Sequence, residues 1–283
     1  MTLRKAQLAG TWYPGTASGC RDQIAAFIAS TRADATDTAS RAGGVVPHAG
    51  WVFSGSIACR VFHHLSTVTA PDVVVVFGMH MHPSSRPCIM THGTWETPLG
   101  PVPIHEALAE GLAEAFDFSQ DRLNDFERDN TIELQAPFIR HFFPDTPFVP
   151  VGVPPTPTAA EIGAAAVALA TDRDLSLLVI GSTDLTHYGP NYGFMPEGSG
   201  PRAVEWVKND NDRRAIPAIL ALDPQRVIRE GRDSNNACCS GAVSAAVSAA
   251  AAAGAAHPRL LAYSTSHDIS PGASFVGYAG IVL

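Results

Sequence analysis

The chain has 283 residues, 46% hydrophobic and 16% charged, a composition that excludes general disorder and suits one large domain over residues 1–283. Acidic residues outnumber basic ones, 27 to 19, without a Lys/Arg cluster, which argues against nucleic acid and anionic membranes as partners. No apolar stretch reaches the roughly 20 residues that cross a bilayer, and five irregularly spaced cysteines do not suggest a disulfide framework. These features predict a cytoplasmic protein.

Short apolar runs alternate with helical patterns along the chain, which predicts an α/β fold with a largely parallel central sheet flanked by helices. The expected strands cover residues 43–47, 73–77, 148–153, 175–181, 260–265 and 275–283. The expected helices cover residues 20–30, 56–65, 104–116, 131–143, 159–170, 203–222, 224–230 and 242–256. Two details follow from local chemistry: Ser54 is placed to cap the second helix, and Pro137 should end or kink the fourth.

Polar side chains follow three of these apolar runs. His48 follows the first strand, His80 the second, and Asp184 and His187 come just after the run at 175–181. Runs without polar alternation suit strands covered on both faces, and the carboxyl ends of such parallel strands share the edge where ligands bind. We therefore expect these four side chains to converge.

Each of these histidines could have a separate structural role, but two of them at strand ends are better explained as ligands of one metal ion. Neutral imidazole is the commonest metal ligand. His82 is the alternative to His80, since a strand-like path aims only one of them into the site. Cys238 and Cys239 stand where a long helix begins, a position that favours the thiolate. Adjacent cysteines chelate poorly, so we expect at most one of the two to face the site.

Asp184 and His187 are close enough in sequence to hydrogen-bond each other or to face one ligand together. An alternative role for the Asp184 side chain is to cap a short helix. This role is compatible with His187 acting as an acid/base group. Glu133 has two interpretations: it orients a ligand histidine, or it belongs to a solvated helix start.

Taken in order, several motifs resemble the MEMO family (mediator of ErbB2-driven cell motility), whose bacterial members are called AmmeMemoRadiSam system protein B. The family is similar in fold to class III extradiol ring-cleaving dioxygenases. The motifs are Ala9-Gly10-Thr11-Trp12-Tyr13-Pro14, Pro47-His48-Ala49-Gly50, the His80 loop up to Thr97-Pro98-Leu99-Gly100, Asn130-Thr131-Ile132-Glu133, Ser182-Thr183-Asp184-Leu185-Thr186-His187-Tyr188-Gly189, Cys238, and Ser274-Phe275-Val276-Gly277-Tyr278-Ala279.

The resemblance implies a mononuclear metal site formed by His48, His80 and Cys238, with Fe(II) as the expected ion and copper as the alternative. It also implies that His187 is the acid/base group, with Asp184 beside it. The chain departs from the family pattern at three places: Gly78-Met79 stands before His80, Asn130 replaces a histidine, and Cys239 replaces a glycine.

The function expected from these residues is that of a non-haem, dioxygenase-like oxidoreductase acting on a small-molecule, aromatic substrate. Two alternative functions are compatible with the same residues. One is a hydrolase with Cys238 as nucleophile, His187 as base and Asp184 as orienting group. The other is a non-catalytic peptide-binding scaffold, which the lack of an Arg cluster for phosphate disfavours. The sequence leaves the substrate and the oligomeric state open.

Overall fold

One nine-stranded sheet organises the computed structural model, which describes residues 3–30, 42–120 and 128–283. Its strands are β2 (Gly43–Val46), β3 (Val73–Gly78), β4 (Cys88–Ile89), β7 (Ser119–Gln120), β8 (Phe148–Gly152), β9 (Leu177–Ser182), β10 (His187–Tyr188), β11 (Arg259–Thr265) and β12 (Phe275–Val282). Their order is β10-β12-β2-β9-β3-β8-β4-β7, and β11 pairs with β12. A small separate sheet joins β1 (Leu3–Arg4), β5 (Thr94–Trp95) and β6 (Val102–Pro103).

The four central strands, β2, β9, β3 and β8, are parallel to one another. Antiparallel strands flank them, with β12 beside β2 and β4 beside β8. Every residue of β2, β3 and β8 is buried, in keeping with their β-branched, uninterrupted apolar sequences. The predicted α/β fold with a largely parallel central sheet is confirmed.

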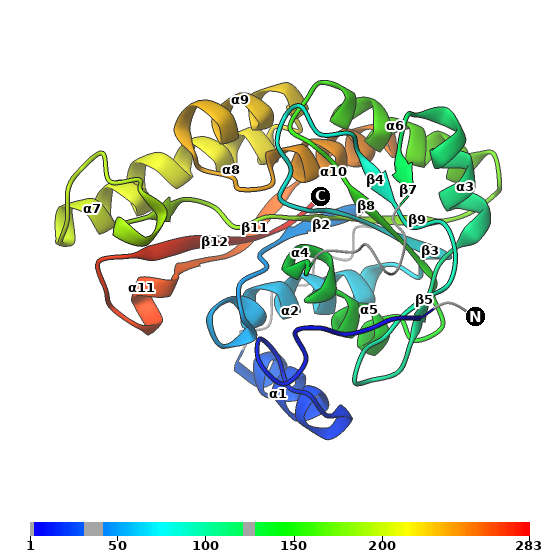
Figure 1. Cartoon of the computed structure of the whole chain (residues 1–283), viewed down its shortest axis with the longest axis horizontal. Coiled ribbons are helices and arrows are strands. Elements are labelled where there is room, and N and C mark those ends of the chain that lie inside the picture. Colours follow the sequence, from blue (N-terminus) through cyan, green and yellow to red (C-terminus); the bar gives the residue numbers. More distant parts are fainter. Residues whose placement is uncertain (1–2, 31–41, 121–127) are drawn as a thin grey trace.

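Helices cover both faces of this sheet (Figure 1). One face carries α1 (Ala17–Ser30), α2 (Trp51–Val68), α4 (Asn130–Glu133) and α5 (Ala136–Phe142). The other carries α3 (Glu106–Ala115), α6 (Thr158–Thr171), α8 (Asp212–Leu220), α9 (Pro224–Ser234) and α10 (Ser240–Ala252). The short helices α7 (Pro201–Trp206) and α11 (Ser266–Ile269) lie at one end of the molecule. Across the described part of the chain, no helix combines the length and the apolar character that a membrane crossing requires.

Two helix predictions need correction. The second helix starts at Trp51 with Gly50 as N-cap, so Ser54 lies inside it and its hydroxyl donates to the Ala49 carbonyl, 2.9 Å away. A serine bonded back to a preceding carbonyl is compatible with a helix interior and caps nothing. The predicted helix at residues 131–143 is two short helices, α4 and α5. Pro137 stands in the first turn of α5, where its missing N–H is tolerated.

The closest helix packing joins α6 and α10, on the face of the sheet that supports the candidate site. An added Cβ on Gly163 in α6 would overlap the backbone carbonyl oxygen of Ala245 in α10. Both helices are alanine-rich, so their backbones can approach without bulky side chains between them. Gly163 is therefore required by packing, although glycine is a poor helix former.

Replacing Gly163 by alanine sets these two effects against each other. Helix propensity alone would stabilise the folded state by about 1 kcal/mol, whereas the overlap with Ala245 should destabilise it by about 1–3 kcal/mol. We expect Gly163→Ala to lower the free energy of unfolding measured by urea titration. Ala168→Gly, at an exposed position of the same helix, measures the effect of helix propensity on the free energy of unfolding without a change in packing. A Gly163→Ala protein more stable than wild type would show that the contact is not tight.

Candidate metal centre

The carboxyl ends of three adjacent parallel strands meet at one edge of the sheet. His48 lies two residues beyond β2, Asp184 lies two residues beyond β9, and His80 lies two residues beyond β3, in the spatial order β2-β9-β3. The expected convergence at this edge is therefore met for His48, His80 and Asp184. His187, three residues further along from Asp184, lines the same cavity.

The chain turns sharply before His80. Met79 has a φ of 71°, in the left-handed region that non-glycine residues rarely occupy. Its backbone N–H donates to the hydroxyl of Thr131 in α4, at 2.6 Å. This hydrogen bond offsets part of the conformational cost, on the order of 1 kcal/mol, and fixes the direction in which His80 leaves the strand.

The cysteines are brought to the same edge by the segment between α9 and α10. Asn235 ends α9 in the left-handed conformation, which reverses the chain. The Cys238 N–H then donates to the Asp184 carbonyl at 3.1 Å, and the Cys239 N–H donates to the Thr183 hydroxyl at 3.1 Å. Two hydrogen bonds thus fasten the start of α10 to the end of β9.

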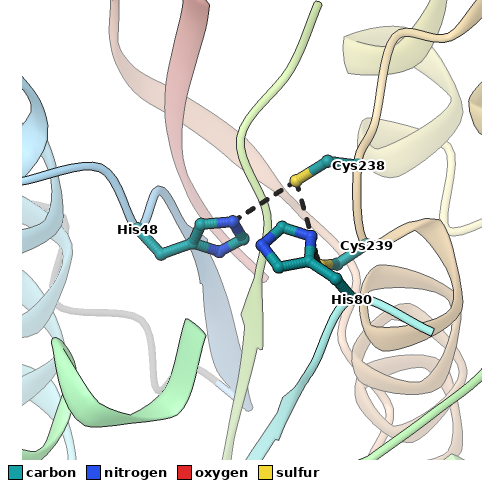
Figure 2. A group of neighbouring side chains, drawn as sticks. All are labelled: His48, His80, Cys238 and Cys239. Carbon is teal, nitrogen blue, oxygen red and sulfur yellow. Dashed lines mark hydrogen bonds between the residues drawn. The ribbon is translucent and has the colours of Figure 1, made fainter. Parts of the chain in front are cut away.

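His48, His80, Cys238 and Cys239 form one cluster (Figure 2). One ligand atom from each residue lies within 4.8 Å of all the others. Cys238 Sγ is 3.3 Å from His48 Nε2, Cys239 Sγ is 3.4 Å from His80 Nδ1, and the two sulfurs are 3.8 Å apart. The expectation that at most one cysteine would face the site is wrong. Cys239 is the non-helical N-cap of α10, so the two side chains do not diverge as they would along a strand.

Ser182, at the end of β9, determines which nitrogen of His48 faces the cluster. Its hydroxyl donates to the Thr131 carbonyl at 2.6 Å and lies 3.0 Å from His48 Nδ1. With its proton used by that carbonyl, the hydroxyl oxygen accepts from Nδ1–H. In the neutral ring, His48 Nε2 is then the nitrogen with the free lone pair, and it faces Cys238. Such an outer hydrogen bond is typical of metal-ligating histidines.

Charges compensate one another inside the cluster. Burial opposes the protonation of His48, but the Asp184 carboxylate, with Oδ2 3.9 Å from Nε2, and Cys238 raise the pKa of His48 to about 9. Burial also opposes ionisation of Cys238, but the hydrogen bond from Cys239 and the charge of His48 hold its pKa well below the usual range. The thiolate, which is the form that binds metals, is therefore favoured at Cys238.

These residues fit a single metal ion. Two imidazoles and two sulfurs of suitable spacing offer soft and borderline ligands, and Ser182 leaves the ligating lone pair of His48 free. His82, the alternative to His80, lies outside the cluster: it is exposed and its Nδ1 is 2.7 Å from the Ser84 hydroxyl.

A cavity of about 650 Å³ opens onto the cluster. His48, His80, Asp184 and His187 all line it. The rest of its wall is largely aromatic or hydrogen-bonding, formed by residues that include Trp12, Phe53, Asn130, Tyr192, Ser274 and Tyr278. The cavity therefore combines aromatic walls, which suit a small-molecule site, with an unusually large share of polar groups.

His187 and Asp184 have different neighbours from those expected. His187 Nδ1 is 3.2 Å from the Leu185 carbonyl and therefore donates to it, which leaves Nε2 unprotonated in the neutral ring. The ring makes an edge contact with Tyr192, with centroids 4.9 Å apart. The Asp184 carboxylate accepts from the backbone N–H of His48 at 2.8 Å. Asp184 caps no helix, and it positions His48.

Two polar residues of α4 support the site in ways the sequence did not reveal. Glu133 was a candidate for orienting a ligand histidine, but its Oε1 accepts from the Leu8 N–H at 2.7 Å and from the Tyr13 hydroxyl at 3.1 Å. It holds the N-terminal segment and is fully buried. Asn130, where the family pattern has histidine, donates from its amide to the His48 carbonyl at 3.0 Å.

A buried carboxylate supports the segment that carries His187. Asp212, at the start of α8, accepts from the Thr186 N–H at 3.0 Å and from the Tyr263 hydroxyl at 2.7 Å. It is fully buried, and burial raises its pKa to about 6 despite the hydrogen bonds that favour the ionised form. Gly277 of β12 leaves the space that this carboxylate occupies.

The fold and the cluster together define a class: an α/β protein with two histidines and two cysteines gathered at the carboxyl edge of its parallel strands. The family model described as Memo-like protein matches residues 4–282. The chain therefore belongs to the Memo family.

Relatives agree with this assignment, and one solved structure matches the fold. A MEMO1 family protein of Methanopyrus kandleri is 34% identical over 246 residues, covering 85% of this chain and 82% of the relative. A MEMO1 family protein of Pyrococcus furiosus is 30% identical over 292 residues, covering 99% of each. The crystal structure of an uncharacterized protein from Escherichia coli K12 matches in fold, with a TM-score of 0.50 at 17% identity over 78% of this chain and 91% of that one.

The raised pKa of Asp212 predicts how the free energy of unfolding changes with pH. Since its folded pKa, about 6, lies above the unfolded value, the group stabilises the fold at low pH and loses that contribution as pH rises through 6. Lowering the pH from about 7 to about 5 should raise the unfolding free energy of wild type by about 1 kcal/mol relative to Asp212→Asn. Urea titrations of both proteins at each pH measure this difference. A difference that does not change with pH would place the Asp212 pKa outside this window.

Proposed function

We propose that the chain is an oxidoreductase that holds one redox-active metal ion, Fe(II) or copper, and acts on a small aromatic substrate in the adjoining cavity. His48, His80 and Cys238 would hold the ion. The observation that carries the proposal is the cluster of ligand atoms, all within 4.8 Å of one another, at a cavity that His48 and His80 line together with His187. A bound iron or copper ion would supply the electron-transfer and oxygen chemistry that side chains lack.

The side chains of the chain itself would position the ligands and the substrate. Ser182 and Asp184 hold the His48 ring and backbone, so that Nε2 stays directed at Cys238. The aromatic rings of Phe53 and Tyr192 offer the cavity wall against which a flat substrate ring packs. Such packing would bring the hydroxyl groups of a catechol-like substrate toward the imidazole edge of the cavity.

His187 is the proposed acid/base group. Because Nδ1 donates to the Leu185 carbonyl, Nε2 is the nitrogen that can take a proton from a substrate hydroxyl. His187 lies in the cavity wall beside Tyr192 and is not one of the four clustered ligands, so proton transfer and metal binding fall to different residues. Substitution of His187 should therefore affect turnover and leave metal binding intact.

The hydrolase alternative fits these contacts less well. It required His187 as the base for Cys238, whereas the imidazoles hydrogen-bonded to the Cys238 sulfur are those of His48 and His80. It also required Asp184 to orient that base, and the carboxylate accepts from the His48 backbone. A metal-free protein with a low-pKa thiol would nevertheless support a thiol hydrolase, and a protein with neither property would support a non-catalytic scaffold.

Metal content tests the proposed site directly. Protein purified without oxygen should contain about one iron or copper ion per chain, and His48→Ala should lose at least tenfold in metal affinity, because an imidazole ligand is gone. Elemental analysis after dialysis measures the ion. His82→Ala is the matched control, since His82 is exposed and lies outside the cluster. Equal metal content in wild type and His48→Ala would contradict the proposal.

Oxygen uptake with a panel of catechols tests the reaction. We expect His187→Gln to keep its metal and to lose turnover by about 100-fold or more, as is typical when a general acid or base is removed. An oxygen electrode records the rate, and His82→Gln serves as the control for a histidine substitution elsewhere. Undiminished uptake by His187→Gln would remove this residue from the mechanism.

A further inference from the structure

The cluster contains a second sulfur, that of Cys239, beyond the three ligands of the proposed function. Cys239 is buried, with 3% of its surface exposed, and its thiol is directed at the other three ligands (Figure 2). We propose that Cys239 is a fourth metal ligand, so that the site is a two-histidine, two-cysteine site. The inference rests on the proposed metal site and specifies its ligands.

The distances between donor atoms support four ligands around one ion. A tetrahedral ion with metal–sulfur bonds of about 2.3 Å and metal–nitrogen bonds of about 2.0 Å separates two sulfurs by about 3.8 Å, and a sulfur from a nitrogen by about 3.5 Å. The Cys238 and Cys239 sulfurs are 3.8 Å apart. The sulfur–nitrogen distances are 3.3 Å from Cys238 to His48 and 3.4 Å from Cys239 to His80. Three of the six donor–donor distances thus match a tetrahedral site, and the other pairs lie within 4.8 Å.

The backbone holds Cys239 in place. Its N–H donates to the Thr183 hydroxyl, and that hydroxyl in turn donates to the Asp184 carbonyl at 2.8 Å. The preceding residue is fixed by its own bond to Asp184, so both cysteines are tied to the end of β9. A ligand held by the backbone needs little reorganisation to bind an ion.

A fourth ligand changes which ions the site prefers. Two sulfurs and two imidazoles form a set that favours tetrahedral, thiophilic ions such as Zn(II) and Cu(I) over Fe(II), which in oxygenases is usually held by histidines and a carboxylate. Of the two ions in the proposed function, copper is therefore the better match to this chain. In addition, Cys239 occupies a coordination position that a three-ligand site would leave open.

Cobalt spectroscopy of the apoprotein counts the thiolate ligands. Co(II) bound tetrahedrally by cysteines has a near-ultraviolet charge-transfer band whose intensity grows with each thiolate, so wild type should show a two-thiolate band. Cys239→Ala and Cys238→Ala should each lose about half of it. Cys239→Ser replaces the thiol by a hydroxyl of nearly the same size, and its band should lose as much intensity as that of Cys239→Ala. Cys59→Ala, which removes a buried thiol outside the cluster, should lose none.

The outcomes separate the fourth ligand from the proposed function. A full-intensity band in both Cys239 variants, with loss in Cys238→Ala, would overturn the fourth ligand and leave the three-ligand site standing. A halved band in the Cys239 variants, with no oxygen uptake by the copper- or iron-loaded wild type, would support the fourth ligand and count against the oxidoreductase. If wild type binds neither cobalt nor copper nor iron, both proposals fail.

Discussion

The candidate site depends on the parallel alignment of β2, β9 and β3. Parallel neighbours end at the same edge, so the residues just beyond each strand are brought together without being close in sequence. β9 is central to this arrangement, because Ser182 at its end touches His48 and the next two residues bind the backbone of both cysteines. The pairing of the strands, together with these contacts beyond the end of β9, therefore brings the ligand atoms together before any ion binds.

Buried charges in the cluster are stable only as a group. Burial disfavours the ionised form of Asp184 and raises its pKa, and it also disfavours charge on His48 and Cys238. The imidazolium of His48 lies between the carboxylate and the thiolate, 3.9 Å and 3.3 Å away, and offsets both. An ion bound at the cluster would take over this positive charge, so His48 could then be neutral and ligate through Nε2.

The strands and the histidines at their ends could be predicted from sequence patterns, whereas the contacts that hold these histidines could not. Unbroken apolar runs identify buried parallel strands, and a histidine directly after such a run is conspicuous, as His48 and His80 are. Ser182 and Glu133 are ordinary residues whose roles depend on partners 134 and 125 positions away. The direction of Cys239 depends on the backbone angles of a helix N-cap, which the sequence does not specify. These parts of the site are set by tertiary contacts.

The cluster presents different ligands to its two sides. His48 and His80 line the larger cavity, whereas Cys238 lines a smaller one. His187 and Tyr192 border both, so the segment that carries them forms a shared wall. A substrate in the larger cavity would contact imidazoles and aromatic rings, while the sulfurs lie against the start of α10. Cys239 does not line the larger cavity, so as a fourth ligand it would fill a coordination position at the metal and leave the protein wall of that cavity unchanged.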